Sequence, residues 1–437
     1  MINRQTTPQV AIVGGGLAGL TAANYLARAG MSVQVFEKSH APGGRATTDA
    51  GQGFQFNTGP HALYRRAAGV GILKELGVEF SGSIAATSGA FAIARGARHT
   101  LPAGFVSLLT TGLLNLSAKF ELGKLLGGIG KINPEPWQHR TVREWLDETI
   151  VHPEVRQLLQ AVVRVTTYTN APERQSAGSA IRQIQLSLEG GVYYLNGGWQ
   201  TLVDGLRQAA ENSGVQIITG HRVTTIERSP QFLLHTADGR QFTADAVILA
   251  IAPADAAAML TGHAHEMLKQ WSNELTPVRA ACLDLGLKSL PQPQSLFALG
   301  IDQPLYFSVH SAWAKLAADG GQVIQLAKYL APDAASDAKA DEQELESLAD
   351  LMQPGWRSLV VTRRFLPRMT VTNAVVTAAQ GGLAGRPGPQ VPGCDGLYVA
   401  GDWAGSEGQL ADASFASGRQ AAELIIQQTA ATNAAAA

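Results

Sequence analysis

The first forty residues carry apolar runs and a helical stretch in an order that is typical of a parallel β-sheet. Val10–Val13 is an uninterrupted apolar run that ends at three consecutive glycines, and good helix formers then occupy residues 18–29. A second strand is predicted over Ser32–Phe36, directly after the glycine that ends the helix. Because both connections are short, this β-α-β unit predicts two parallel strands.

Similar elements return in the middle of the chain and near its C-terminus. Helices are predicted over residues 201–210 and 414–427, and buried strands over 215–218, 247–251 and 396–400. Between them, predicted strands at 222–228, 232–236 and 241–243 surround the turn Asp238-Gly239, which indicates a small antiparallel meander. The strands and helices typical of a parallel α/β sheet are therefore spread over three separate parts of the sequence.

Two blocks of different character separate these parts. Residues 66–190 are mainly helical in pattern, for example at 143–149 and 154–165. The second block, 256–385, mixes predicted strands at 280–285, 305–309 and 323–329 with a helix at 341–352. A chain of 437 residues exceeds one ordinary domain, so this alternation predicts two interleaved domains.

Composition narrows the class of protein. Hydrophobic residues make up 45% of the chain and charged residues 16%, which allows a large core. Lys and Arg number 34 against 35 Asp and Glu, so no overall basic field favours nucleic acid. Cys282 and Cys394 cannot form a disulfide framework or a Cys-rich metal site, and no metal is predicted. Residues 1–5 are polar, without an apolar signal-peptide core, so we expect a cytoplasmic protein.

One segment bears on membrane contact. Residues 99–118 carry no formal charge, but polar side chains keep their hydropathy modest, and a single crossing would separate the two ends of one domain. An apolar face at helical spacing is formed by Val106, Leu109, Leu113, Leu116 and Phe120. The segment is either a helix packed on the core or a helix lying on a membrane surface, so peripheral contact through 101–126 stays open.

A glycine motif gives the first chemical signal. Gly14, Gly16 and Gly19 form G-x-G-x-x-G between a strand and a helix, and Glu37 ends the next strand. The first glycine permits the tight turn, the second lets the backbone approach a pyrophosphate, and the third lets helix and strand pack closely. Glu37 is placed to accept hydrogen bonds from a ribose. The four residues predict a dinucleotide site that takes NAD or FAD.

Further motifs resemble the superfamily of flavin-containing amine oxidases and phytoene desaturases. They are Glu37 with Gly43-Gly44-Arg45, the loop Phe56–His61, the segment Asn196–Leu202, and Leu397–Asp402 with Ala416–Ala422. The resemblance covers the first sixty residues, about 190–255, and the last forty. It implies bound FAD. Leu410 and Ala281, at two positions where amine oxidases carry other residues, favour the phytoene desaturase-like side of the superfamily.

The resemblance also implies a domain arrangement. The expected fold is α/β, with a Rossmann-like FAD-binding domain of parallel sheet, helices and a small β-meander, interleaved with an α+β substrate domain. Residues 1–65, 191–255 and 386–430 would form the FAD-binding domain, and 66–190 and 256–385 the substrate-binding domain. The low-complexity end, 431–437, is expected to be disordered.

The resemblance assigns roles residue by residue. Arg45 would contact the pyrophosphate, Val223 the adenine and Asp402 a ribityl hydroxyl, while amides at Leu410 and Ala411 would face the flavin ring. The full predicted cofactor set is Gly14, Gly15, Gly16, Leu17, Ala18, Gly19, Glu37, Lys38, Gly44, Arg45, Gly59, Pro60, His61, Val223, Gly401, Asp402, Leu410 and Ala411. Residues 405–408 offer no thiol, so FAD is expected to be non-covalent.

Two absences favour a hydrophobic substrate over an amine. Amine oxidases of the superfamily carry a cage aromatic, which aligns with Leu410, and commonly a lysine, which aligns near Ala281. Trp199 and Trp403 flank glycine motifs and would wall the same cavity, or else belong to the core. We expect hydride transfer from a hydrophobic substrate to flavin N5. A second dinucleotide motif is lacking, so electrons would leave to oxygen or a quinone.

His61 is the candidate catalytic residue, because it follows Gly59 in the loop expected to approach the flavin. It would either move a proton during hydride transfer or only hydrogen-bond the flavin or backbone. The alternatives to a desaturase are a flavin amine oxidase and a redox-neutral, flavin-dependent polyene isomerase. A non-enzymatic protein that resembles the GDP dissociation inhibitors is disfavoured by the intact glycine motif, Arg45 and Gly401-Asp402.

Overall fold

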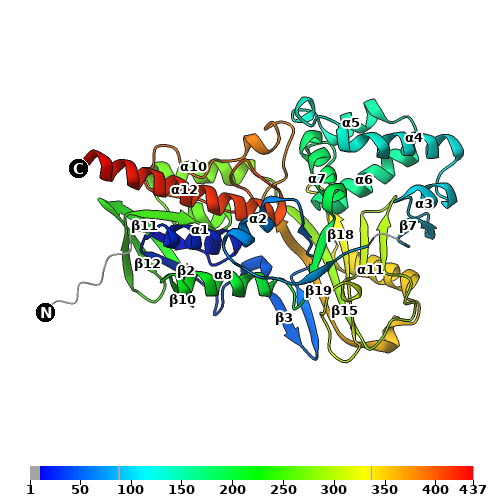
Figure 1. Cartoon of the computed structure of the whole chain (residues 1–437), viewed down its shortest axis with the longest axis horizontal. Helices are drawn as coiled ribbons and strands as arrows, with labels where there is room; N and C mark the ends of the chain where they lie inside the picture. The colour runs from blue at the N-terminus through cyan, green and yellow to red at the C-terminus, as the bar shows by residue number, and fades with distance from the viewer. Residues whose placement is uncertain (1–9, 87–88, 336, 437) are drawn as a thin grey trace.

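The structure, a computed structural model, describes residues 10–86, 89–335 and 337–436. A five-stranded parallel sheet in the order β10-β2-β1-β14-β20 forms one half of the molecule, on the left of Figure 1. Its strands are β1 (Val10–Val13), β2 (Val33–Glu37), β10 (Gln216–Thr219), β14 (Ala246–Leu249) and β20 (Leu397–Val399). The strands lie where the apolar runs predict them, and the predicted α/β class is confirmed.

Both faces of the parallel sheet are covered, which explains why its strands are apolar on both sides. One face packs against α1 (Leu17–Arg28), α8 (Gln200–Asn212) and α12 (Leu410–Ala436). The other packs against the meander of β11 (Val223–Ser229), β12 (Gln231–Thr236) and β13 (Gln241–Ala244), and against α9 (Pro253–Ala258) and α10 (Gly262–Glu274). Along β1, Ala11 and Val13 face the meander while Val10 and Ile12 face the helices.

A seven-stranded sheet forms the other half, in the order β19-β15-β18-β17-β16-β7-β8. Its strands are β7 (Phe91–Ala94), β8 (Ala97–Thr100), β15 (Val278–Leu287), β16 (Phe297–Gly300), β17 (Leu305–Val309), β18 (Gln322–Leu330) and β19 (Val360–Thr372). Since β7 and β8 come from the block 66–190 and the other strands from 256–385, the two intervening blocks build one unit. The domain boundaries themselves remain a prediction.

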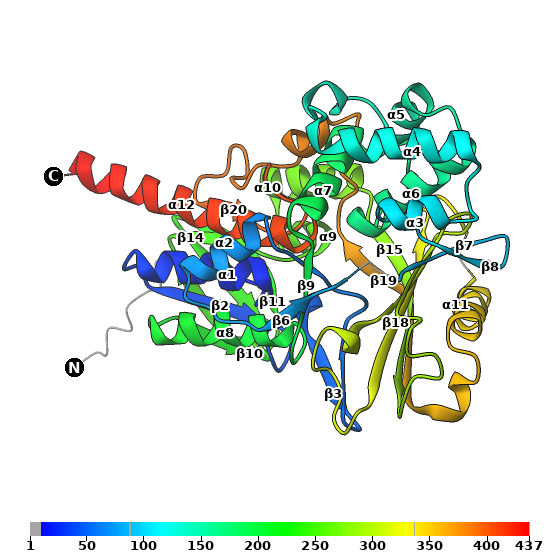
Figure 2. The ribbon, with the colours of Figure 1, turned by 45° about the vertical axis from the view of Figure 1, so that its right-hand side comes forward.

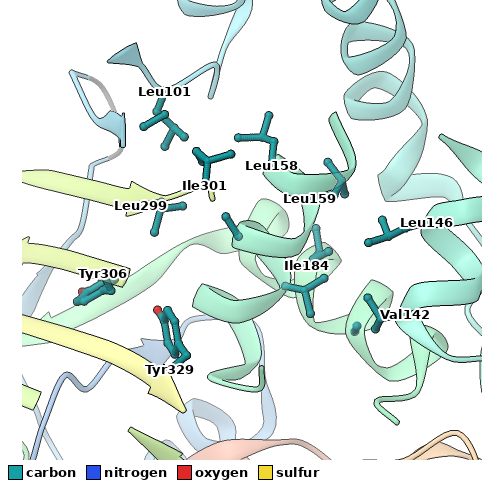
Figure 3. Close-up of a cluster of buried hydrophobic side chains, with 14 of the residues drawn as sticks. Leu101, Val142, Leu146, Leu158, Leu159, Ile184, Leu299, Ile301, Tyr306 and Tyr329 are labelled. Atoms are coloured by element: carbon teal, nitrogen blue, oxygen red, sulfur yellow. The ribbon is translucent and has the colours of Figure 1, made fainter. Parts of the chain in front are cut away.

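Helices cover both faces of this second sheet (Figure 2). α11 (Ala338–Met352) packs on one face, and the opposite face carries a helical layer. The layer consists of α3 (Phe105–Thr110), α4 (Leu116–Gly128), α5 (Val142–Thr149), α6 (Pro153–Thr167) and α7 (Ala177–Gly190). Figure 3 shows the buried cluster between sheet and layer, where Leu299, Tyr306 and Tyr329 of the strands meet Leu158 and Ile184 of the helices.

Short strands connect the two halves. β3 (Thr48–Gly51) pairs with β4 (Phe54–Asn57), and β9 (Val192–Leu195) pairs with β5 (Leu63–Tyr64) and β6 (Gly82–Ile84). α2 (Ala68–Glu75) packs against α12 at the boundary. The chain therefore passes between the halves several times, as interleaving requires.

The predicted continuous apolar face over 106–120 is wrong. The segment forms two helices, because Thr111 donates its hydroxyl to the Thr100 carbonyl and Asn115 caps α4 by accepting from the Ala118 amide at 2.9 Å. Leu113, between the helices, is buried in the core, whereas Leu116 and Phe120 are exposed. The periodicity in sequence thus spans a break that only hydrogen bonds to other segments reveal.

The C-terminal residues also differ from expectation. α12 continues to Ala436, so 431–436 are helical rather than disordered, in line with the high helix propensity of alanine. Residues 1–5 and 437 lie outside the described residues. Within the described ranges, no helix has the length and apolarity needed to span a membrane.

Candidate active site

A groove crosses the carboxyl ends of the parallel strands and reaches the second sheet. Its larger part is a cavity of about 440 Å³, and a neighbouring cavity of about 270 Å³ extends it towards the meander. The two share Gly14, Glu37, Lys38, Ile251 and Asp255, so they form one elongated groove. Carboxyl ends of parallel strands are where ligands bind in open α/β sheets.

The glycine motif shows which of its members face the groove. A Cβ on Gly19 would lie 2.0 Å from the carbonyl oxygen of Gly14, so this position lets the helix pack on the turn. A Cβ on Gly16 would meet nothing closer than the Gly43 carbonyl oxygen at 3.9 Å, on the cavity side. Gly16 is thus not needed for internal packing, and its bare backbone leaves room for a ligand.

Glu37 lies where the two cavities meet. One carboxylate oxygen accepts from the Gly15 amide at 2.8 Å and the other from the Ser39 amide at 2.8 Å. These bonds fix a nearly buried carboxylate against the glycine turn. Each oxygen keeps further acceptor capacity, which suits the hydroxyls of a ribose.

Arg45 and Asp402 lie together in the larger cavity. Arg45 donates to the Asp402 carboxylate and to the Val371 carbonyl, the latter at 2.8 Å. Asn373 donates its side-chain amide to the other Asp402 oxygen at 2.9 Å. The Arg45 side chain is 40% exposed in the groove, whereas the Asp402 side chain is only 3% exposed. A guanidinium held in this way presents positive charge where the glycine turn offers backbone amides.

Helix α12 points its N-terminus at the cavity. Leu410, Ala411 and Ser414 line it. Leu410 has φ of 56°, in the left-handed region that non-glycine residues rarely adopt. Such a conformation persists only where the surroundings impose it, and it is concentrated at functional sites. The first-turn amides and the helix dipole would favour a group that gains negative charge.

His61 and Trp199 meet on the cavity wall, with ring centroids 4.9 Å apart. The Gly59 carbonyl lies 2.9 Å from Nδ1 of His61, so Nδ1 carries the hydrogen and Nε2 is left as an acceptor. Burial lowers the pKa of His61, and the nearby cation Arg45 lowers it further. The imidazole is therefore neutral near pH 7, with Nε2 free as a hydrogen-bond acceptor.

Trp199 provides a test of whether the residues suit a bound group. Its indole Nε1 is buried, and among the described residues it has no hydrogen-bond partner. A buried unpaired N–H is costly. The orphaned donor, the open side of Gly16 and the elongated groove all fit a long, polar ligand such as a dinucleotide.

The loop that carries His61 is anchored by residues of the second sheet. Gln325 donates to the Gly59 carbonyl at 3.2 Å, and Arg364 donates to the Asn57 carbonyl. Both side chains also bind Asp284, which is fully buried. Burial raises the pKa of Asp284 to about 6, although Arg364 opposes the shift. A polar network thus fixes the loop from the far side of the groove.

Of two further residues predicted to line the cavity, Trp403 does so and Ala281 does not. Trp403 lines the cavity and donates its indole N–H to the Ile251 carbonyl at 3.0 Å. The prediction that Ala281 lines the substrate cavity is wrong. Ala281 lies on the sheet face that packs against α11, as Leu283 does, whereas Cys282 lies on the face that packs against the helical layer. A one-residue difference in register moves a strand residue to the opposite face. Among the described residues that line the larger cavity, the only lysine is Lys38, beside Glu37.

The remaining predicted residues are placed as follows. Gly14, Gly16, Leu17, Ala18, Glu37, Lys38, Gly44, Arg45, Pro60, His61, Gly401, Asp402, Leu410 and Ala411 line the larger cavity, and Val223 lines the smaller one. Gly15 and Gly59 act through their backbone: the Gly15 amide donates to Glu37, and the Gly59 carbonyl accepts from His61. Gly19 packs inside the turn.

Sequence reasoning missed the wall supplied by the second half. Tyr168, at the end of α6, lines the cavity and donates to the Pro60 carbonyl at 2.9 Å. Met369, Thr370 and Val371 of β19 complete the wall. No motif marks these positions, and the left-handed backbone of Tyr168, with φ of 58°, is not visible in the sequence.

Comparisons with known proteins agree with this geometry. The family model for flavin-containing amine oxidoreductases matches residues 17–426. Hydroxyneurosporene desaturase of Cereibacter sphaeroides is 27% identical over 59% of this chain and 58% of its own length. Phytoene dehydrogenase of Streptomyces griseus is 25% identical over 55% and 53%, and a putative flavin-containing monoamine oxidase of Mycobacterium tuberculosis is 29% identical over 58% of each chain. The chain thus spans little more than half the length of these relatives.

Solved structures share the whole fold. An oxidoreductase from Methanosarcina mazei has a TM-score of 0.72 and 20% identity, with 96% of this chain and 99% of that chain covered. A putative protoporphyrinogen oxidase from Exiguobacterium has a TM-score of 0.67 and 20% identity, with 97% and 99% covered. At these identities the likeness shows the fold alone.

Replacing Glu37 tests the ribose end of the groove. Glu37→Arg should lower the affinity for FAD at least ~100-fold, because a charged acceptor is lost and a cation crowds the turn. Flavin absorbance of the purified protein and titration of added FAD measure this loss. Glu37→Gln, which retains an acceptor oxygen, should bind FAD with intermediate affinity. Normal FAD occupancy in the Arg variant would show that Glu37 does not bind the ribose.

Asp412 makes stability depend on pH. Its carboxylate is buried in the first turn of α12 and accepts from the Gly69 amide at 2.7 Å, and burial raises its pKa from 3.8 to about 7. The folded state therefore retains a proton that the unfolded state releases, and stability falls as pH rises towards 7. Between pH 5 and 7 we expect a loss of about 2 kcal/mol relative to Asp412→Asn. Urea unfolding of both proteins measures it; a constant difference between pH 5 and 8 would refute the shift.

Proposed function

The chain belongs to the family of flavin-containing amine oxidoreductases, and from this premise we propose that it is an FAD-dependent oxidoreductase acting on a hydrophobic organic substrate. The reaction would resemble that of phytoene desaturases, with removal of a hydride from a C–H bond. The observation that carries the proposal is the apolar part of the cavity wall, where Leu410, Met369 and Tyr168 belong to one hydrophobic cluster.

FAD would lie along the groove. Val223 and the meander would hold the adenine, Glu37 the ribose, and Gly16 with Arg45 the pyrophosphate. Asp402 would accept from the ribityl chain, next to Arg45. Among the described residues that line the cavity there is no cysteine, which supports non-covalent binding.

Bound FAD would supply a hydride acceptor at N5 and return to the oxidised state by passing electrons to oxygen or a quinone. The protein would position the substrate C–H bond and exclude water, since apolar side chains surround this end of the cavity. The first turn of α12 would stabilise negative charge at the adjacent edge of the ring.

His61 is proposed to hold or accept a proton at Nε2. Its Nδ1 donates to Gly59, its low pKa keeps the ring neutral, and the network of Gln325 and Arg364 fixes the loop in place. A role limited to hydrogen bonding is the alternative. His61→Gln separates the two, because glutamine can hydrogen-bond but cannot take up a proton near neutral pH.

Two other reactions are alternatives to desaturation. A flavin amine oxidase is favoured by the Mycobacterium tuberculosis relative. It is disfavoured by the aliphatic Leu410 and by the absence of lysine near this end of the cavity among the described residues. A redox-neutral polyene isomerase would need the same apolar cavity, and it would use reduced flavin with no net change in oxidation state.

Anaerobic mixing separates these reactions. A carotenoid precursor in micelles should bleach the flavin absorbance of the purified protein, whereas a panel of small amines should leave it oxidised. Rapid bleaching by an amine would overturn the substrate class proposed here. A polyene that isomerises when mixed with the previously reduced protein, while the flavin stays reduced, would identify an isomerase.

Leu410→Tyr tests the shape of the substrate end. The added ring should narrow the cavity and raise the KM for a bulky polyene by about tenfold, while a short analogue is affected less. Leu410→Met, which keeps nearly the same volume, is the matched control and should behave like the parent protein. Steady-state kinetics with the two substrates measure the difference. Equal effects on long and short substrates would mean that Leu410 does not limit the cavity.

A further inference from the structure

Helices α3 and α4 lie at the outer edge of the helical layer (Figures 1 and 2), and together they expose several large apolar side chains, called here the α3–α4 patch. The patch consists of Phe105, Val106, Leu109, Leu116 and Phe120. Phe105 is 76% exposed, Leu116 84% and Phe120 78%. Single exposed apolar residues are normal, but five large ones on two adjoining helices mark a surface that contacts something.

α3 is only weakly held by the protein core, through Leu108, which is partly buried against the cluster beneath the helical layer. The helix has six residues, none of them fully buried. Its hydrogen bonds are local: the Gly104 amide donates to Ser107 at 2.9 Å, and Lys119 of α4 donates to the Leu109 carbonyl at 2.7 Å. A helix this short is marginal in water and gains stability by burying an apolar face. Covering the exposed side of α3 together with that of α4 would therefore stabilise both helices.

The charges beside the patch indicate the kind of partner. Residues 101–131 carry three lysines and one acid, Glu121. Glu121 is engaged by the Val151 amide at 2.7 Å and by His152 at 2.8 Å. Lys124 and Lys131 are exposed. An apolar face bordered by ammonium groups is the chemistry that recognises a bilayer with anionic headgroups.

The size of the patch argues against a second copy of the chain. At roughly 170 Å² for a full large side chain, five side chains at these exposures offer about 600 Å². A stable protein–protein interface needs about 800 Å² from each partner. Insertion into a lipid surface needs no complementary partner shape, so a patch of this size suffices.

We propose that the α3–α4 patch docks onto the surface of an anionic lipid bilayer. The patch side chains would enter the interface while Lys124 and Lys131 contact headgroups. Beneath the patch, Leu113 and Leu122 belong to the same buried cluster as Tyr168 of the cavity wall. The docked face and the apolar side of the site thus share one buried cluster, but docking does not depend on the proposed reaction.

Vesicle co-sedimentation of the full chain with bound FAD tests the proposal. The protein should sediment with vesicles of phosphatidylcholine and phosphatidylglycerol, and much less with phosphatidylcholine alone. Phe105→Ser/Phe120→Ser should lower partitioning at least tenfold, because two aromatic side chains no longer enter the interface. Leu188→Ser is the matched control: Leu188 is 59% exposed on α7, away from the patch, and this variant should bind like the parent.

A second variant keeps the test decisive if the serine substitutions unfold the protein. Lys124→Gln/Lys131→Gln should lower binding to the anionic vesicles severalfold and leave binding to phosphatidylcholine unchanged. The proposal is overturned if the parent protein fails to bind anionic vesicles, or if the patch variants bind as the parent does. It is equally overturned if light scattering shows a dimer that the Phe105→Ser/Phe120→Ser variant abolishes. Flavin reduction is measured separately, so a failed reaction leaves the vesicle result standing.

Discussion

Close backbone packing between the β1–α1 turn and helix α1 is the constraint on which the groove depends. Gly19 must be glycine because a Cβ would lie 2.0 Å from the Gly14 carbonyl oxygen, and this contact brings the helix N-terminus to the strand ends. The Glu37 carboxylate then binds the Gly15 amide and fixes the turn to β2. Amides, helix dipole and carboxylate are thus oriented before any ligand arrives, which lowers the cost of binding.

The second half of the molecule completes what the parallel sheet begins. Arg364 and Gln325 reach from β19 and β18 to carbonyls of the loop that carries His61, and both bind the buried Asp284. Removing one partner of such a buried network would leave an unpaired charge, so the network acts as one unit. The position of His61 in the groove therefore depends on the packing of the second sheet against the first half.

The middle of the groove and the end near Leu410 differ in chemistry, which separates cofactor binding from substrate specificity. The middle of the groove, around Glu37 and Arg45, is lined by backbone amides and charged side chains that suit a ribose and a pyrophosphate. The end near Leu410 is lined by aliphatic and aromatic side chains that belong to the core between the second sheet and the helical layer. The same layer exposes the α3–α4 patch, so one block of sequence shapes both the substrate end and the outer surface.

The sequence by itself determined the elements whose signals are local: the β-α-β unit, the glycine motif, Glu37 and the meander, because short-range periodicity and turn residues specify them. Tertiary structure decided what depends on pairing between distant segments. The register of β15 turned Ala281 away from the cavity. A hydrogen bond from Thr111 to Thr100 divided the predicted helix. Tyr168 and Met369 reach the cavity only through packing of the two halves, and no local pattern encodes such contacts.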